Sequence, residues 1–167
     1  MLLNQASLPE GSRLQSGNFY IPRLGQLNAP QHLPVSMSRF VAKYRVLFDD
    51  EIHIPKRLEL SEFGDLADHI HILLLGQSRE TWTFQRFAPF SAAQIGLDLT
   101  AAKVNDQRFA PYNQRLEEKL ARLLREKSPF YVGTHIDEIG GECVAHRLFI
   151  PMSDVGRRIT HCILMSV

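Results

Sequence analysis

From residue 54 onward, the apolar and polar positions of the chain alternate between the periods of strands and of helices. The apolar run at 69–75 ends at Gly76 and predicts a strand, and 81–88 alternates with period two, which predicts another. Gly140-Gly141 marks a hairpin between two later apolar segments. The last three predicted strands are 130–137, 143–152 and 158–165.

The clearest helical pattern covers 111–127, and Pro129 prevents its continuation. Its apolar stripe is Tyr112, Leu116, Leu120, Leu123 and Leu124. A second, shorter helix is predicted at 61–68, weakened by Gly64. Because a meander of antiparallel strands cannot bury its apolar face alone, the long helix must cover it, and the fold class is α+β.

A further amphipathic helix is predicted after Ser38, which has the residue type of an N-cap. Its apolar face is Phe40, Val41, Tyr44, Leu47 and Phe48. Residues 1–37 hold four of the nine prolines and show no sustained periodicity, so they predict an extended or poorly ordered arm. The predicted organisation is therefore arm (1–37), flanking amphipathic helix (38–53) and folded domain (54–167).

Composition narrows the function classes. Nineteen basic and eighteen acidic residues give a net charge of +1 and no basic stripe, which argues against a nucleic-acid partner. No apolar run is long enough to span a bilayer, and no signal peptide is recognisable, so no membrane partner is expected. Two cysteines, Cys143 and Cys162, favour a reduced, cytoplasmic protein.

Three short motifs in register with this element order resemble a PAS domain, and more narrowly a stand-alone PAS subfamily common in alphaproteobacteria. They are Ile54-Pro55-Lys56-Arg57, Gly96-Leu97-Asp98-Leu99-Thr100, and Arg147 to Met152 followed by Gly156. The resemblance covers 54–167 and implies a five-stranded antiparallel sheet with a long helix and short helices on one face. It implies that 86–100 walls a cavity, with Gly96 making a tight turn, although Pro89 departs from the glycine that the subfamily usually carries there.

The resemblance also bears on cofactors. Haem-binding PAS sensors typically supply a histidine from the long helix, and flavin photosensors carry a cysteine motif before it; this sequence has neither. We therefore expect no cofactor and a colourless protein. His69 and His71 have a spacing that can serve a metal, but no histidine or cysteine set supplies three ligands, and we expect no metal. No nucleophile and base with an orienting third group is evident, so we expect no catalytic residue and no enzyme.

A small-molecule cavity is the remaining candidate site, with mostly apolar walls and a few polar groups. Its expected walls are Trp82, Phe84, Tyr112, Leu116 and Leu120, and its expected polar groups are Arg86 and His146. Arg86 is assigned to the side of Phe84 by strand alternation, and His146 to the side of Leu148. The alternative is a core filled by side chains.

Several strands are apolar on both faces, among them Leu148-Phe149-Ile150 and Ile163-Leu164-Met165. Such runs imply burial on both sides of the sheet, and the long helix can cover only one. We therefore expect the flanking helix to cover the other face, from its own chain or from a second copy in a homodimer. The candidate interface residues are Phe40, Tyr44, Leu47 and Phe48.

The predicted function is a sensory PAS module that acts through protein–protein interaction with a signalling partner, such as a histidine kinase or another regulator, tuned by a small ligand. One alternative is a sensor with an obligatory bound metabolite. Another is an enzyme on a ketosteroid-isomerase-like scaffold, which would need an inward carboxylate that the predicted strand positions do not offer.

Overall fold

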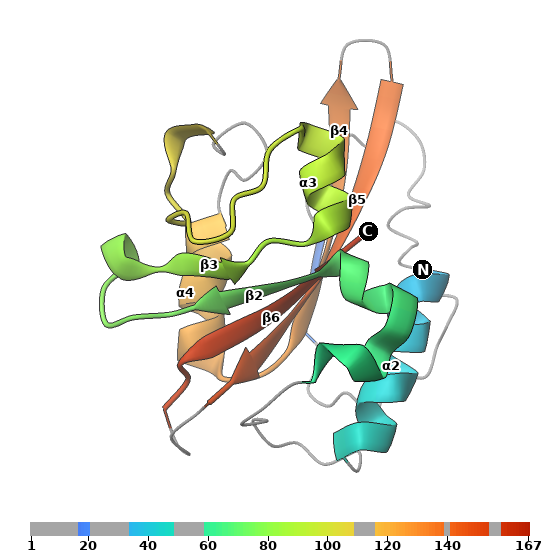
Figure 1. Cartoon of the computed structure of the whole chain (residues 1–167), viewed down its shortest axis with the longest axis horizontal. Helices are drawn as coiled ribbons and strands as arrows, with labels where there is room; N and C mark the ends of the chain where they lie inside the picture. The colour runs from blue at the N-terminus through green and yellow to red at the C-terminus, as the bar shows by residue number, and fades with distance from the viewer. Residues whose placement is uncertain (1–16, 21–33, 49–58, 109–115, 139–140, 154–157) are drawn as a thin grey trace.

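The computed structural model describes residues 17–20, 34–48, 59–108, 116–138, 141–153 and 158–167. It confirms the α+β class: one antiparallel sheet carries helices on both faces (Figure 1). The strand order is β1-β4-β5-β6-β2-β3. The strands are β1 (Gly17–Tyr20), β2 (Ile70–Leu74), β3 (Thr83–Arg86), β4 (Phe130–Glu138), β5 (Gly141–Met152) and β6 (His161–Ser166).

The five strands β4-β5-β6-β2-β3 form the predicted PAS-like antiparallel sheet. β1 adds a sixth strand from the segment predicted as an arm, and it pairs with β4 over Gly17 to Tyr20. The remainder of 1–33 lies outside the described residues.

Three helical elements agree with the predicted positions, with shifted ends: α2 (Val35–Phe48), η3 (Leu60–His69) and α4 (Leu116–Glu126). The structure adds η4 (Arg79–Thr81) and α3 (Pro89–Ile95), whose positions were not predicted. The prediction of Ser38 as N-cap is wrong: α2 begins at Val35, and the Ser38 N–H already donates to the Pro34 carbonyl at 3.0 Å. The predicted strand at 69–75 begins one residue late, because η3 continues to His69.

Local residue types explain α3, which occupies the middle of the stretch 86–100. Pro89 sits at the start of the helix, where its missing N–H costs nothing. Gly96 ends it in the left-handed region at φ 72°, and its N–H donates to the Ala92 carbonyl at 2.9 Å. The proline that departs from the subfamily pattern thus begins a helix, and the glycine makes the expected turn.

Side chains of successive strand residues enter two separate apolar layers, which we call the inner core and the outer core. In β6, Cys162 and Leu164 lie in the inner core and Ile163 lies in the outer core. The inner core is Leu73, Leu75, Trp82, Phe84, Phe87, Leu99, Val104, Leu116, Leu120, Leu123, Phe130, Val132, Phe149, Ile159, Cys162 and Leu164. The outer core is Met37, Phe40, Val41, Tyr44, Phe63, Leu66, Ile70, Tyr131, Leu148, Ile150, Met152, Ile163 and Met165.

The helices divide between these layers. α4 contributes Leu116, Leu120 and Leu123 to the inner core, while α2 and η3 pack on the opposite face, as Figure 1 shows. The Phe40 ring of α2 stacks on Phe63 of η3 with centroids 4.9 Å apart. The outer face is therefore covered by the chain's own flanking helix, which accounts for strands that are apolar on both sides.

Candidate functional site

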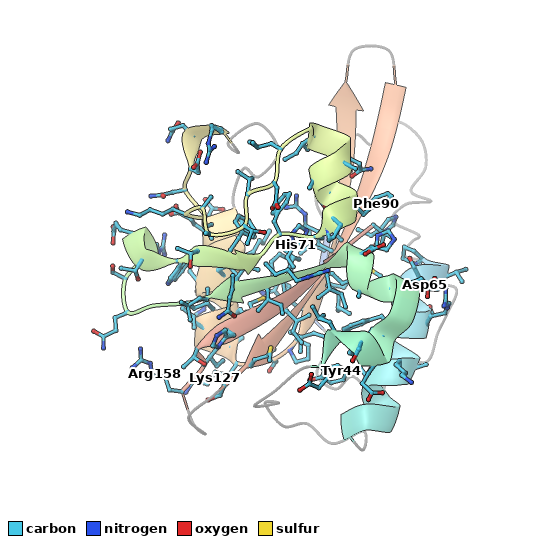
Figure 2. All side chains as sticks on the ribbon, viewed as in Figure 1. Tyr44, Asp65, His71, Phe90, Lys127 and Arg158 are labelled. Carbon is cyan, nitrogen blue, oxygen red and sulfur yellow. The ribbon has the colours of Figure 1, made fainter. Side chains whose placement is uncertain are left out.

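The most unusual polar group of the inner layer is the buried imidazole of His71 in β2, only 3% exposed. Its Nδ1 accepts the Ala88 N–H at 3.1 Å. The neutral ring therefore carries its proton on Nε2, which lies 3.3 Å from the Ser91 hydroxyl and donates to it. Figure 2 shows His71 near the middle of the molecule, where β2 meets the start of α3.

Burial keeps this imidazole neutral. Burial, and after it the nearby guanidinium groups of Arg147 and Arg86, lower the pKa of His71 to about 3. With both ring nitrogens engaged and a pKa far below neutrality, His71 cannot act as a general base at neutral pH. It is a connector between the sheet and α3.

Aromatic rings surround the imidazole. Phe87 meets it edge-on at 4.7 Å between centroids, and Phe84 lies at 5.9 Å. The two phenylalanines are themselves perpendicular at 5.1 Å. Edge-to-face packing of this kind adds to the free energy of area burial, so the group is held in one arrangement.

Arg147 of β5 occupies the same face of the sheet as Phe149, two residues along the strand. Burial lowers the pKa of its guanidinium. Arg147 and His71 lie on the same face of the sheet, on strands separated by β6, and the positive charge of Arg147 helps to lower the pKa of His71. Neither His71 nor Arg147 was predicted as part of the cavity. A histidine within the apolar run 69–75 was the only available signal.

Four of the predicted cavity residues do come together. Trp82, Phe84, Leu116 and Leu120 all lie in the inner core, each at most 3% exposed. The Trp82 indole N–H donates to the Gly76 carbonyl at 3.1 Å, which gives it a structural role. Tyr112 lies outside the described residues.

The assignment of Arg86 to the Phe84 side is wrong, because β3 is irregular. Leu73 pairs with Phe84, but Ile72 pairs with Arg86, so β3 uses one extra residue at this point. A bulge of this kind reverses the alternation beyond it. The Arg86 guanidinium instead donates to the carbonyls of Ala67 at 2.8 Å and Ile70 at 2.6 Å, at the end of η3.

The assignment of His146 to the cavity is also wrong. Alternation along β5 places it with Leu148 and Ile150, as predicted, but those residues belong to the outer core. Its Nδ1 lies 2.6 Å from the Tyr131 hydroxyl, and Tyr131 is an outer-core residue. His146 and Trp82 therefore lie on opposite faces of the sheet.

Two of the candidate interface residues are already covered within the chain. Phe40 and Tyr44 are 0% and 4% exposed in the outer core. The side chains of Leu47 and Phe48 lie outside the described part of the chain. Phe40 and Tyr44 can therefore meet a second copy only if α2 leaves the sheet.

The described residues offer little reactive chemistry. Burial raises the pKa of the Cys162 thiol, so it is not a thiolate near neutral pH. No three histidine, cysteine, aspartate or glutamate side chains of the described segments gather as metal ligands. Within the same segments, every helix is too short or too polar to cross a bilayer.

Comparison of the chain with protein-family models, with curated proteins and with solved structures found no match.

Proposed function

We propose that this chain is a PAS-like sensory module that signals through protein contacts and is tuned by a small ligand in the inner layer. The observation that carries the proposal is the division of one sheet between two apolar layers. Leu148 and Ile150 contact the outer core while Phe149, between them, contacts the inner core. A change in the packing of one layer therefore acts directly on strands that support the other.

In this proposal, the flanking helix α2 is the element that passes the signal to a partner. α2 packs on the outer core through Met37, Phe40, Val41 and Tyr44, beside Phe63 and Leu66 of η3. Its partner would be a signalling protein such as a histidine kinase or another regulator, or a second copy of the chain in a homodimer. Contacts through Phe40 and Tyr44 require α2 to leave the sheet, because both side chains are buried in the outer core.

Catalysis is not part of the proposal. The inner layer's histidine is neutral with both nitrogens engaged, and the Cys162 thiol is protonated. The described strand residues of the inner core are apolar, apart from His71 and Arg147 beside it, so no inward carboxylate supports a ketosteroid-isomerase type of reaction.

Native mass spectrometry of freshly purified protein, before and after denaturation, tests the proposal. A module tuned by an exchangeable ligand is expected to have the mass of the bare chain, alone or as a dimer. A small adduct present in every molecule and lost on denaturation would favour the alternative, a sensor with an obligatory metabolite. A visible absorption band that remains with the protein would contradict the expected absence of a chromophore.

A further inference from the structure

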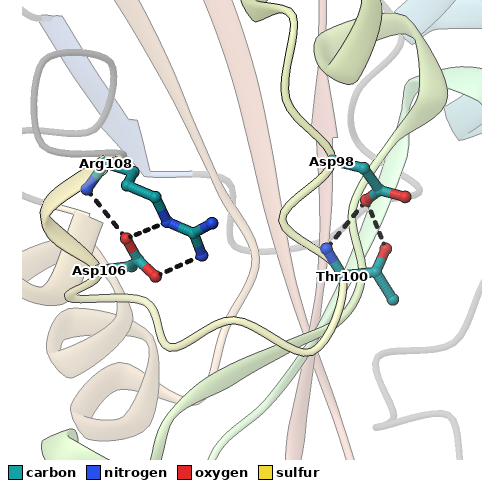
Figure 3. A network of polar contacts seen from close by, with 4 residues as sticks. All are labelled: Asp98, Thr100, Asp106 and Arg108. Carbon is teal, nitrogen blue, oxygen red and sulfur yellow. Dashed lines mark hydrogen bonds and ion pairs between the residues drawn. The ribbon is translucent and has the colours of Figure 1, made fainter.

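The segment from Ala88 to Leu99 has its two ends fastened together beside β3. The Phe87 N–H donates to the Thr100 hydroxyl at 3.1 Å, and the Ala101 N–H donates to the Phe84 carbonyl at 2.7 Å. Asp98 holds the returning end, because its carboxylate accepts the Thr100 N–H at 2.9 Å and hydroxyl at 2.8 Å (Figure 3). The intervening chain is a closed loop that carries α3.

Between its ends, this loop buries little apolar surface. None of residues 89–98 is fully buried, whereas the inner-core helix α4 buries three leucines. Ala92, Ile95 and Leu97 are only partly buried where they pack on the inner core, and Phe90 is 40% exposed. Segments with few buried apolar contacts open locally at low free-energy cost.

Polar contacts to the sheet hold this loop in place, since it buries little apolar surface. His71 accepts the Ala88 N–H at the start of α3 and donates to Ser91 one turn later. The Phe90 ring packs on His69 at 4.4 Å, at the end of η3. The backbone also has suitable hinges, since Ala88 is extended at ψ 128° and Gly96 is left-handed.

We infer that Ala88–Leu99 is a hinged flap over the inner core and that His71 is the latch that holds it closed. Opening the flap uncovers Phe84, Phe87 and the neutral imidazole, which suit a small, uncharged aromatic molecule. The flap itself does not depend on the proposed sensory function, but the assignment of a ligand to the opened layer does.

Hydrogen exchange of the full chain, followed by mass spectrometry, tests the latch. In the wild type, amides of 88–99 should exchange faster than those of β2 and β6. His71→Phe removes both hydrogen bonds and should speed exchange of 88–99 by about tenfold, and Ser91→Ala, which removes one, by a smaller factor. Tyr131→Phe is the matched control, because it removes a buried hydroxyl contact on the opposite face and should leave the flap unchanged.

Exchange of 88–99 at the rate of β2 and β6 in the wild type and both latch variants would overturn the inference. If His71→Phe accelerates exchange throughout the sheet, Ser91→Ala decides: faster exchange in 88–99 alone supports the latch, and no change refutes it. The neutral dye N-phenyl-1-naphthylamine then tests the ligand. It should fluoresce more strongly with Ser91→Ala, which weakens the latch but keeps the imidazole, than with the wild type. If the flap opens but the dye does not bind, His71 is still the residue that holds the flap closed. The ligand part of the proposed function would then be contradicted.

Discussion

At the scale of single residues, His71 shows how a polar side chain can be essential to an apolar layer. A buried imidazole is stabilised only if it stays neutral and both nitrogens find partners, and the Ala88 N–H and the Ser91 hydroxyl supply them. Arg147 and Arg86 disfavour its charged form. Its protonation state is therefore coupled to folding.

The stability of the protein should fall as the pH is lowered, in part through this group. The folded-state pKa of His71, about 3, lies below the value of an unfolded histidine, so the unfolded chain takes up a proton first. The contribution is fully present above about pH 6.5 and is lost toward pH 3, amounting to about 1.4 kcal/mol between pH 7.5 and pH 5.5. Urea denaturation of wild type and His71→Asn at the two pH values measures it. If wild type and His71→Asn lose the same free energy of unfolding between the two pH values, the lowered pKa of His71 would be contradicted.

Gly96 should be required for its backbone conformation and not for space. Its φ is 72°, yet no atom lies within 4 Å of where a Cβ would stand. Gly96→Ala should lower the free energy of unfolding by about 1 kcal/mol, and Gly96→Val by on the order of 1–3 kcal/mol. Gly96→Asn is the control, because asparagine tolerates the left-handed region and should cost less. Equal melting temperatures for all three variants and the wild type would show that the turn is unstrained.

At the scale of elements, side chains at the ends of helices and strands fix how neighbouring elements meet. Arg86 at the end of β3 donates to two carbonyls where η3 passes into β2. On the surface, Arg39 of α2 pairs with Asp65 of η3 at 3.0 Å, and this exposed pair should add little stability. Partly buried hydrogen bonds, not surface charges, therefore position η3.

Replacing Arg86 should destabilise the fold instead of altering a ligand site. Arg86→Met keeps the aliphatic stem but loses the charge-assisted hydrogen bonds to Ala67 and Ile70, which should cost about 1.5–3 kcal/mol. Arg79→Met, at an exposed position of η4, is the matched control and should change stability by less than about 0.5 kcal/mol. Urea denaturation compares the two. An unchanged free energy of unfolding for Arg86→Met would contradict the hydrogen bonds of Arg86 at the end of η3.

At the scale of the whole molecule, two cores share a single sheet, so neither can be lost alone. The strands that bury Phe149 and Leu164 on one side bury Leu148 and Ile163 on the other. This arrangement favours one cooperative unfolding transition for the domain. It is also the basis for expecting signals to pass between the inner layer and α2.

A substitution in the outer core should therefore shift a probe in the inner core. Phe40→Ala, a fully buried α2 position, should cost about 3–5 kcal/mol. Trp82, the single tryptophan, lies in the inner core and reports its unfolding by fluorescence. The Trp82 transition and the far-ultraviolet circular dichroism transition should move together to lower urea. Arg39→Ala, on the exposed face of the same helix, should leave both in place. A Trp82 transition unmoved by Phe40→Ala would show that the two layers unfold independently.

The sequence by itself determined the elements and their class. Period-two alternation located β3, apolar runs with their glycine turn signals located the other strands except β1, and helical spacing located α2 and α4, because these patterns are set by backbone geometry and by which residues must be buried. It also determined where α3 begins and ends, since Pro89 and Gly96 set these ends through their own backbone preferences. Four inner-core members of the candidate cavity followed from the same patterns.

Only the tertiary structure decided whether a given strand residue packs in the inner core or in the outer core. Alternation correctly grouped His146 with Leu148 and Ile150, but because β5 is apolar on both sides, nothing local indicated that this group would meet α2 and not α4. The bulge that turns Arg86 toward η3 depends on the register between β3 and β2, which is a relation between two segments. The covering of the outer core by the chain's own α2, and the meeting of His71 with Ala88 and Ser91, likewise depend on docking between elements distant in sequence. Periodicity specifies that a face is buried, and only packing specifies what buries it.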